Sequence, residues 1–397
     1  MKRFTAAPLV AALLVLGFTP AVAQSSQYEV ESEHYHVISE VSRNHAQAIS
    51  DRMEAMLSLY NQQFRYPLNE LEAPLRVRVF ATKDRYDQYL RRIVNQTRPG
   101  YVYLHYQDLA KSELVGYFVE DDRLDQSMIH QSFVQFFRAF VDNPPLWLRE
   151  GFAVYFEASR YDPEFGTAIY RENLAWLDTL KEMVDGTSER PMLAFENLFT
   201  MDAAEARANL ASFYPQAWGV ISFLLNADTP EVNRIMWDSL SALDGTADLE
   251  ENVSTVYREA FQWVDQGQLE ESFLDYVNER RSFRGWVSYG VEQYNAGNAA
   301  EAESAFVQAL KLREDNYVPY YYLGLVNYQR QNYGLADFYY QSAMERGADE
   351  AVTLYALGVN AYADNRFDQA EAYLQQTVDT DPAYRERAEG LLIRIRG

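Results

Sequence analysis

The sequence predicts an α+β N-terminal domain, in which a small sheet precedes a helical bundle, followed by an all-α solenoid of helical repeats. Three observations predict this order. Alternating apolar patterns, which are typical of strands, are confined to about the first 120 residues. Helical spacing of apolar residues dominates from there to the end of the chain. Matching small and bulky residues recur every 34 residues in the last third.

Composition limits the classes of function. The chain has 397 residues, is 48% hydrophobic and carries a formal net charge of −23, so it can bury a large core and is not a disordered acidic tail. The negative charge argues against nucleic acid as a partner, because duplex binding depends on cations that neutralise phosphates. Cysteine is absent, which excludes disulfides, thiolate metal sites and cysteine nucleophiles.

The first 23 residues have the pattern of a secretory signal peptide. Lys2 and Arg3 precede an apolar run over residues 6–18, and Ala21-Val22-Ala23 forms a small-residue cleavage site before Gln24. The run is too short to cross a bilayer, which needs about 20 residues, and no later segment is apolar enough. We therefore expect an exported protein with no membrane span. A bacterial periplasm is the simplest destination, and full secretion stays open.

Residues 24–280 are expected to form the first domain. The expected elements are a strand over 28–38, a helix over 44–64, strands over 75–80, 101–105 and 113–118, and then helices almost throughout from Asp122. A helical junction rather than a flexible linker is expected over 265–282, because no Gly, Ser or Pro run occurs there.

The last third of the chain repeats every 34 residues. The equivalent positions are Gly290, Gly324 and Gly358, then Ala302, Ala336 and Ala370, then Phe306, Tyr340 and Leu374. Small residues let paired helices approach closely, and the large ones fill the space between pairs. The spacing and the Trp286, Gly290, Ala302 and Phe306 signature resemble a tetratricopeptide repeat. We expect three copies over about 283–384 and a capping helix with Leu391, Leu392 and Ile395 turned inward, which makes residues 283–397 the second domain.

Three positions in the first helix of each repeat are aromatic or aliphatic. They are Val287, Val291, Tyr294, Tyr321, Leu325, Tyr328, Tyr355, Val359 and Tyr362. The resemblance implies that these residues line a peptide-binding groove, which predicts a protein or peptide partner. The alternative is that they pack within the helical stack, because aromatic residues are enriched both in cores and in binding hot spots.

Two segments carry the most informative motif. They are Met128-Ile129-His130-Gln131-Ser132-Phe133-Val134 and Pro145-Leu146-Trp147-Leu148-Arg149-Glu150-Gly151-Phe152-Ala153. Together they resemble the gluzincin type of zinc metallopeptidase, in the peptidase MA-like branch. In that family H-E-x-x-H on one helix is followed by W-L-x-E-G-x-A on the next. The two histidines and the second glutamate bind zinc, and the motif glutamate activates water.

Two residues of the motif depart from the family pattern. The resemblance places His130 at the first ligand, Glu150 at the third, Gln131 at the general base and Val134 at the second ligand. A glutamine amide cannot accept the proton from water, and valine has no lone pair to bind a metal. Catalytic zinc normally takes three protein ligands. We therefore expect no cofactor, with zinc only if an atypical ligand such as Glu157 completes the site.

Helical geometry predicts what surrounds His130. At about 100° per residue, Phe133 and Phe137 share its arc, whereas Gln131, Gln135 and Arg138 point away. His130 is thus expected to face the core. A hydrogen bond or ion pair between His130 and Glu150 is the hypothesis for what replaces the zinc bridge.

Other candidate sites are weaker. Tyr214 matches loosely a gluzincin tyrosine that stabilises the transition state, or is simply a core residue. His34 and His36 alternate onto one side of the first expected strand, a spacing that can bind metal, but no third ligand is in view. The acidic cluster Glu120, Asp121, Asp122 and Asp125 lacks the spacing of a calcium loop and is expected to favour the start of the next helix.

These observations favour a non-catalytic protein, in which a peptidase-like domain without zinc is joined to a repeat module that binds peptide or protein. One alternative is an active zinc peptidase with atypical ligands. The other is a cell-wall or glycan binder, because aromatic residues make up 15% of the chain and aromatic faces stack on sugars. The oligomeric state stays open.

Overall fold

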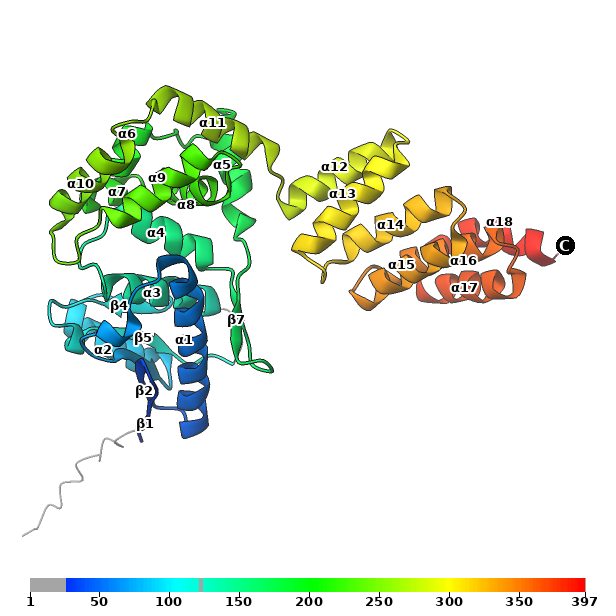
Figure 1. Ribbon diagram of the computed structural model, residues 1–397. Helices are drawn as coiled ribbons and strands as arrows, with labels where there is room; N and C mark the ends of the chain where they lie inside the picture. The colour runs from blue at the N-terminus through cyan, green and yellow to red at the C-terminus, as the bar shows by residue number, and fades with distance from the viewer. Residues whose placement is uncertain (1–25, 121–123, 397) are drawn as a thin grey trace, which may run out of the picture.

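A small N-terminal sheet is followed by a long run of helices (Figure 1). The computed structural model describes residues 26–120 and 124–396. The expected signal peptide lies outside these residues. Among the described helices, none is both long and apolar enough to cross a membrane.

The sheet has five strands in the order β1-β2-β3-β5-β4. The strands are β1 (Tyr28–Glu31), β2 (Tyr35–Ser39), β3 (Leu75–Phe80), β4 (Val102–Leu104) and β5 (Glu113–Tyr117). The central pairs β2–β3 and β3–β5 are parallel, whereas the edge pairs β1–β2 and β4–β5 are antiparallel.

The single strand predicted over 28–38 is wrong, because the structure forms two strands there with a tight turn between them. Glu54 holds the turn: one carboxylate oxygen accepts from the backbone N–H of His34 at 2.7 Å and from the hydroxyl of Ser32 at 2.7 Å. Alternation continues through the turn, so the sequence pattern alone does not mark the break.

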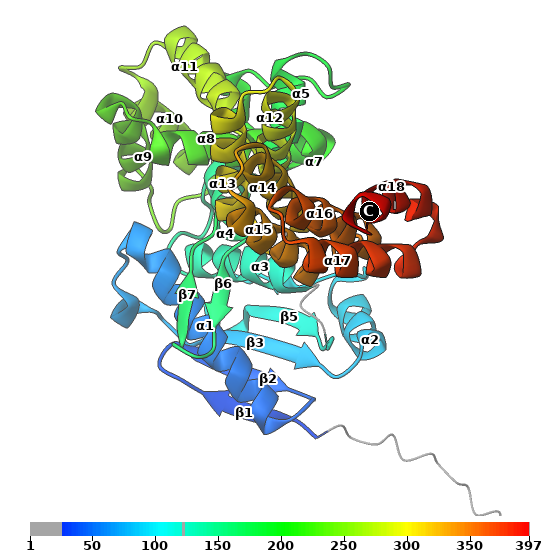
Figure 2. The ribbon, with the colours of Figure 1, turned by 90° about the vertical axis from the view of Figure 1, so that its right-hand side faces the viewer.

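Helices cover both faces of the sheet. The helix α1 (Arg43–Phe64) packs with the inward residues Val37, Val77 and Leu114 into the main core. The helix α2 (Lys83–Val94) packs with Val115 and its neighbours in a separate small core. Figure 2 shows α1 and α2 at different sides of the sheet.

The rest of the first domain is mainly helical. Its helices are α3 (Asp125–Arg138), α4 (Leu146–Phe156), α5 (Leu177–Val184), α6 (Phe195–Thr200), α7 (Ala203–Ala208), α8 (Leu210–Asn226), α9 (Pro230–Ser241), α10 (Leu249–Phe261) and α11 (Gln266–Glu279). One exception to the predicted all-helical course is the hairpin of β6 (Arg160–Asp162) and β7 (Thr167–Ile169). Gly166 closes its turn with a φ of +64°, a conformation that glycine adopts without strain.

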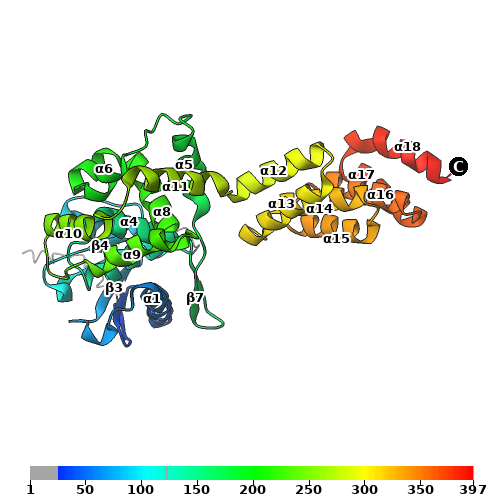
Figure 3. The same ribbon diagram turned by 45° about the horizontal axis from the view of Figure 1, so that its top comes forward.

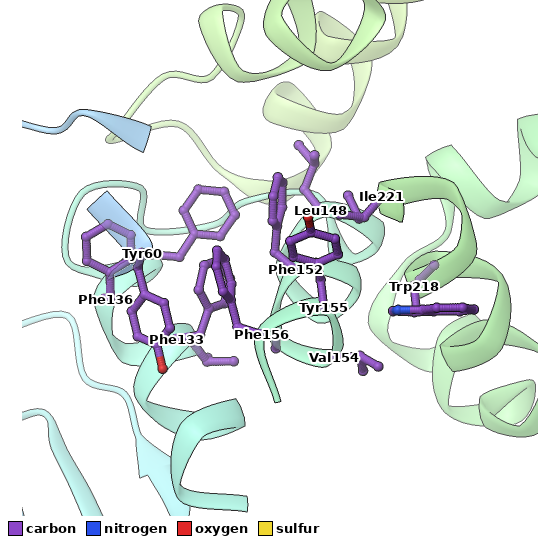
Figure 4. Packing of buried hydrophobic residues seen from close by; sticks show 14 of the residues in the cluster. Tyr60, Phe133, Phe136, Leu148, Phe152, Val154, Tyr155, Phe156, Trp218 and Ile221 are labelled. Carbon is purple, nitrogen blue, oxygen red and sulfur yellow. The ribbon is translucent and has the colours of Figure 1, made fainter. Parts of the chain in front are cut away.

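An aromatic core joins α1, α3 and α4 (Figure 4). The rings of Phe133 and Phe156 stack with centroids 5.4 Å apart, and Tyr60 meets Phe156 edge to face at 5.0 Å. Phe152 is fully buried in the same cluster. This packing fixes α3 against α4 and so determines where their polar residues meet.

The last third is a row of antiparallel helix pairs (Figure 3). The pairs are α12 (Phe283–Asn295) with α13 (Ala299–Leu312), α14 (Tyr317–Gln329) with α15 (Tyr333–Glu345), and α16 (Glu350–Ala363) with α17 (Phe367–Thr380). The helix α18 (Arg385–Arg396) follows, with Leu392 buried and Leu391 and Ile395 packed beside it. The structure thus confirms a helical repeat with the predicted period and an inward-facing terminal helix.

The repeated glycines lie where the paired helices approach most closely. A Cβ atom added at Gly290, Gly324 or Gly358 would lie 2.7, 2.4 or 2.9 Å from the side chain that fills the equivalent position of the second helix. Those side chains are the bulky residues that the 34-residue spacing identifies, and all of them are buried. A larger residue at these glycines would separate each helix pair.

Candidate functional site

The residues of the degenerate motif meet between α3 and α4. Nε2 of His130 lies 3.3 Å from Oε2 of Glu150, and both side chains are 13% exposed. The predicted contact between His130 and Glu150 is therefore confirmed. The aromatic contacts of α3 with α4 hold these two residues face to face.

Glycine in the motif brings a third helix to the site. A Cβ atom added at Gly151 would lie 2.6 Å from the backbone oxygen of Ala217, so α4 and α8 are in backbone contact there. This close crossing places Tyr214 of α8 over Glu150. The hydroxyl of Tyr214 donates to Oε2 of Glu150 at 3.3 Å.

Glu150 is bound on both oxygens. Nε of Arg149 donates to Oε1 at 2.8 Å, while His130 and Tyr214 share Oε2. A buried carboxylate needs such partners, because an unpaired charge in the interior is costly. The three donors come from α3, α4 and α8, so one carboxylate joins three helices.

The electrostatics of the pair favour the ionised forms. Burial alone would raise the pKa of Glu150, but the charge of Arg149 and the hydrogen bond from His130 outweigh it and lower that pKa to about 2. Burial alone would lower the pKa of His130, and the hydrogen bond and charge of Glu150 reverse this and raise it. Both shifts favour an ion pair over a hydrogen bond between neutral groups.

Gln131 is bound to the edge of the sheet. Its Oε1 accepts the backbone N–H of Tyr103 in β4 at 3.0 Å. The strand β4 lies at the edge of the sheet, so this N–H has no neighbouring strand to donate to, and the amide oxygen of Gln131 takes that place. The residue at the position of the general base therefore has a structural partner.

Zinc is the metal that the family resemblance implies, and the residues present do not fit it. Val134 lies in the hydrophobic core at 8% exposure and offers no ligand atom. Glu157 accepts a hydrogen bond from Asn173 at 3.3 Å. Within the described residues, no group of three or more His, Asp or Glu side chains is placed to hold a metal ion. Two ligand-type side chains are fewer than the three of a catalytic zinc site.

Gln135 points away from His130 as predicted, toward the sheet, but it is not on the surface. It is 1% exposed, and its Nε2 donates to the backbone oxygen of Arg76 in β3 at 2.9 Å. Arg138, also predicted to point away, is half-buried, and its Nε donates to the backbone oxygen of Asp142 at 2.8 Å. The reason is that α3 is covered on two sides, by α4 and by the sheet, so its polar side is satisfied by backbone groups.

The weaker candidates have other roles. His34 lies in the β1–β2 turn with Nδ1 2.8 Å from Glu54, and His36 lies in β2 with Nε2 3.3 Å from Glu29, so the prediction that both share one strand is wrong. Asp125 forms a two-pronged ion pair with Arg52, at 2.7 and 2.9 Å. The acidic residues 121 and 122 lie outside the described residues.

The nine positions expected to line a groove are all half-buried. Six of them pack against the hydrophobic clusters of the repeats: Val291, Tyr294, Tyr321, Leu325, Tyr328 and Tyr355. The other three, Val287, Val359 and Tyr362, belong to none of the hydrophobic clusters of the described residues. The six therefore contribute to packing between repeats, and the three are the better candidates for contact with a partner.

Two residues of the site escape sequence reasoning. Arg149 occupies the variable position of the motif, and only its place next to Glu150 could have drawn attention to it. Tyr103 acts through its backbone N–H, which no side-chain pattern reports.

Comparison with known families covers the centre of this site. Residues 127–242 match a family described as a protein of unknown function (DUF1570). The match runs from α3 to α9 and so contains His130, Glu150 and Tyr214. No curated protein matches the chain. The region that holds the His130–Glu150 pair is thus similar to the DUF1570 domain, and helical repeats follow it.

Proposed function

We propose that this chain is an exported, non-catalytic protein, in which a gluzincin-like domain without zinc carries tetratricopeptide repeats that bind a peptide or protein segment. The single observation that carries the first half is the ion pair of His130 and Glu150. The two side chains that would bind zinc bind each other instead, at 3.3 Å.

The surroundings of the pair support this reading. Arg149 and Tyr214 donate further hydrogen bonds to the carboxylate of Glu150. Gln131 accepts the backbone N–H of Tyr103. Activation of water needs a carboxylate base and a metal with an open position. The motif positions supply neither, and each has a structural partner.

The composition of the repeats supports the second half. The first helices α12, α14 and α16 contain only three charged residues, Arg284, Glu292 and Glu350, although 23% of the chain is charged. Tyrosine dominates these helices, and it offers a rigid surface with a hydrogen-bonding tip. Such a surface favours a partner segment that is itself poor in charge.

Metal analysis tests the first half. The purified, exported protein should contain no stoichiometric zinc, and EDTA should leave its melting temperature unchanged. Recovery of about one zinc per chain, together with casein cleavage that EDTA abolishes, would overturn the proposal.

Two variants test whether zinc binding is prevented only by missing ligand side chains or also by the arrangement of α3 and α4. The double variant Gln131→Glu with Val134→His restores the family pattern and should bind zinc more tightly than the native chain. Gln131→Glu alone should not, because two ligands remain. An unchanged zinc affinity in the double variant would speak against a gluzincin-like arrangement of α3 and α4.

Peptide arrays test the second half. Tyr362→Ala and Val359→Ser should abolish capture of uncharged peptides without lowering the melting temperature, because neither residue packs in a hydrophobic cluster of the described repeats. Tyr321→Ala is the contrasting variant and should lower the melting temperature as well. Binding of soluble cell-wall glycan fragments in place of peptides would replace the peptide proposal with the glycan alternative.

A further inference from the structure

A cleft of about 730 Å³ lies between the first domain and the first repeat pair. Its walls are the start of α3, the segment 157–161 that leads into β6, the segment that follows β7, and residues 312–315 at the end of α13. The cleft is separate from the His130–Glu150 pair and from the first helices of the repeats.

Most of the charges in the cleft are paired. Arg52 binds Asp125 through both guanidinium nitrogens, and Arg313 lies 3.5 Å from Asp315. Glu172 is bound by Arg280, which comes from outside the cleft.

Two arginine side chains in the cleft have no partner among the described residues. Arg160 and Arg171 line the cleft, and neither side chain forms an ion pair or hydrogen bond with any part of the chain that the structure describes. Both residues are exposed, so their guanidinium groups can reach a ligand in the cleft.

Arg160 begins β6 and Arg171 follows the end of β7, so both lie at the base of the hairpin. Arg160 pairs with Ile169 across the β6–β7 ladder, so the two side chains share one face. Arg171 is two residues beyond Ile169 and follows the same alternation. All three residues are exposed, whereas Tyr161 and Tyr170 on the opposite face pack against the main core.

A buried hydroxyl adds a third donor. Ser159, next to Arg160, also lines the cleft and is 2% exposed. Its hydroxyl has no hydrogen-bond partner among the described residues. A buried hydroxyl without a partner is costly, and a ligand atom that accepts from it would remove that cost.

We propose that this cleft binds the free terminal carboxylate of a short peptide, held by Arg160 and Arg171 with Ser159 as a further donor. The planar fork of arginine matches a carboxylate with two parallel hydrogen bonds. Carboxylates on the other walls, among them Glu314, disfavour a phosphate dianion. These carboxylates suit a ligand whose other end is an amine. The ligand's carboxylate then faces the arginines, and its ammonium group faces the wall carboxylates.

Titration calorimetry on the full chain without its signal peptide tests the assignment. Trialanine with a free carboxylate should bind, and trialanine amide should bind at least about tenfold more weakly. Arg160→Gln and Arg171→Gln should each weaken binding of the free acid by about tenfold or more. The control Arg207→Gln, at an exposed arginine of α7 outside the cleft, should leave binding unchanged.

Three results would overturn the assignment. The first is equal binding of the acid and the amide. The second is native affinity in both arginine variants. The third is tight binding of inorganic phosphate with no binding of trialanine, which would make the cleft a general anion site. Because Tyr362→Ala should not affect this binding, failure here and failure of the repeat surface can be told apart.

Discussion

Glu150 shows how one residue can hold several elements together. Its carboxylate is bound by side chains from three helices, His130 of α3, Arg149 of α4 and Tyr214 of α8. Arg149 is a cation and the raised pKa of His130 favours its cationic form, so removing the carboxylate leaves two half-buried groups without a counter-charge. Removing one member of such an ion pair costs more free energy of unfolding than the intact pair contributes, because the other charge is left without a partner.

The variant Glu150→Gln should therefore lower the free energy of unfolding by about 3–5 kcal/mol. Urea denaturation of the full chain measures this. The control is Glu189→Gln, at an exposed glutamate with no hydrogen bond among the described residues, which should stay within about 0.5 kcal/mol of the native chain. A loss below about 1 kcal/mol at Glu150 would show that the pair adds little.

The pair also predicts how stability depends on pH. The lowered pKa of Glu150 gives a contribution that is present above its ordinary value of 4.5 and is lost as the pH falls toward about 2. The raised pKa of His130 gives one that is fully present below its ordinary value of 6.5 and is lost as the pH rises through the higher, folded value. Both contributions are therefore present between pH 4.5 and 6.5.

His130→Gln should consequently destabilise the protein most between pH 4.5 and 6.5. Each unit by which the pKa of His130 is raised corresponds to about 1.4 kcal/mol. Urea denaturation of both proteins at pH 4, 5.5 and 8.5 gives the difference. A difference that is the same at all three pH values would mean that folding does not shift the pKa of His130.

Among the elements, the repeat helices depend on the absence of a side chain at one point in each pair. Gly324 faces Tyr340, and a Cβ atom there would lie 2.4 Å from the tyrosine ring. Gly334, in the same helix pair, has no atom within 4 Å of the corresponding position. The two glycines therefore differ in packing, although both lie in helices.

Alanine at these two glycines should act in opposite directions. Gly324→Ala should destabilise by about 1–3 kcal/mol, because the ring of Tyr340 must move in a packed interior. Gly334→Ala should stabilise by about 0.5–1 kcal/mol, because alanine is the better helix former. Thermal unfolding followed by circular dichroism compares them, and destabilisation by both variants would contradict this account of the pairs.

Elements differ in how well sequence predicts them. The helix over 43–64 and the strand over 75–80 follow their expected ranges closely, because their patterns are long enough to be read locally. The hairpin at 160–169 was missed, since strands of three residues hold too little alternation to be seen. The turn within 28–38 was missed because Glu54, which fixes it, is remote in the sequence.

In the whole molecule, the two parts are joined by a short, anchored link. The helix α11 ends at Glu279 and α12 begins at Phe283, so only three residues separate the two helices. Both ends of the link are bound to the first domain: Arg280 contacts Glu172, and Ser282 donates to Asp178 at 2.7 Å. These bonds orient the repeats without a continuous helix.

Removing the anchor should loosen the arrangement without unfolding either part. The variant Arg280→Gln with Ser282→Ala should increase the radius of gyration in solution scattering and speed proteolysis at the link. The melting temperature should fall only modestly, because Ser282 also caps α12 by accepting the backbone N–H of Gly285, and loss of an N-cap costs about 0.5–2 kcal/mol. Scattering identical to the native chain would show that other contacts fix the repeats.

The sequence by itself determined the period of the repeats, the positions of the long helices and the residue types at positions 130, 131, 134 and 150. Those properties depend on residue type and local spacing, which a chain carries before it folds. Only the tertiary structure decided what these side chains contact: the pairing of His130 with Glu150 across α3 and α4, and the bond of Gln131 to the edge strand β4. The physical reason is that each of these partners is remote in sequence and becomes a neighbour only when helices and sheet pack together.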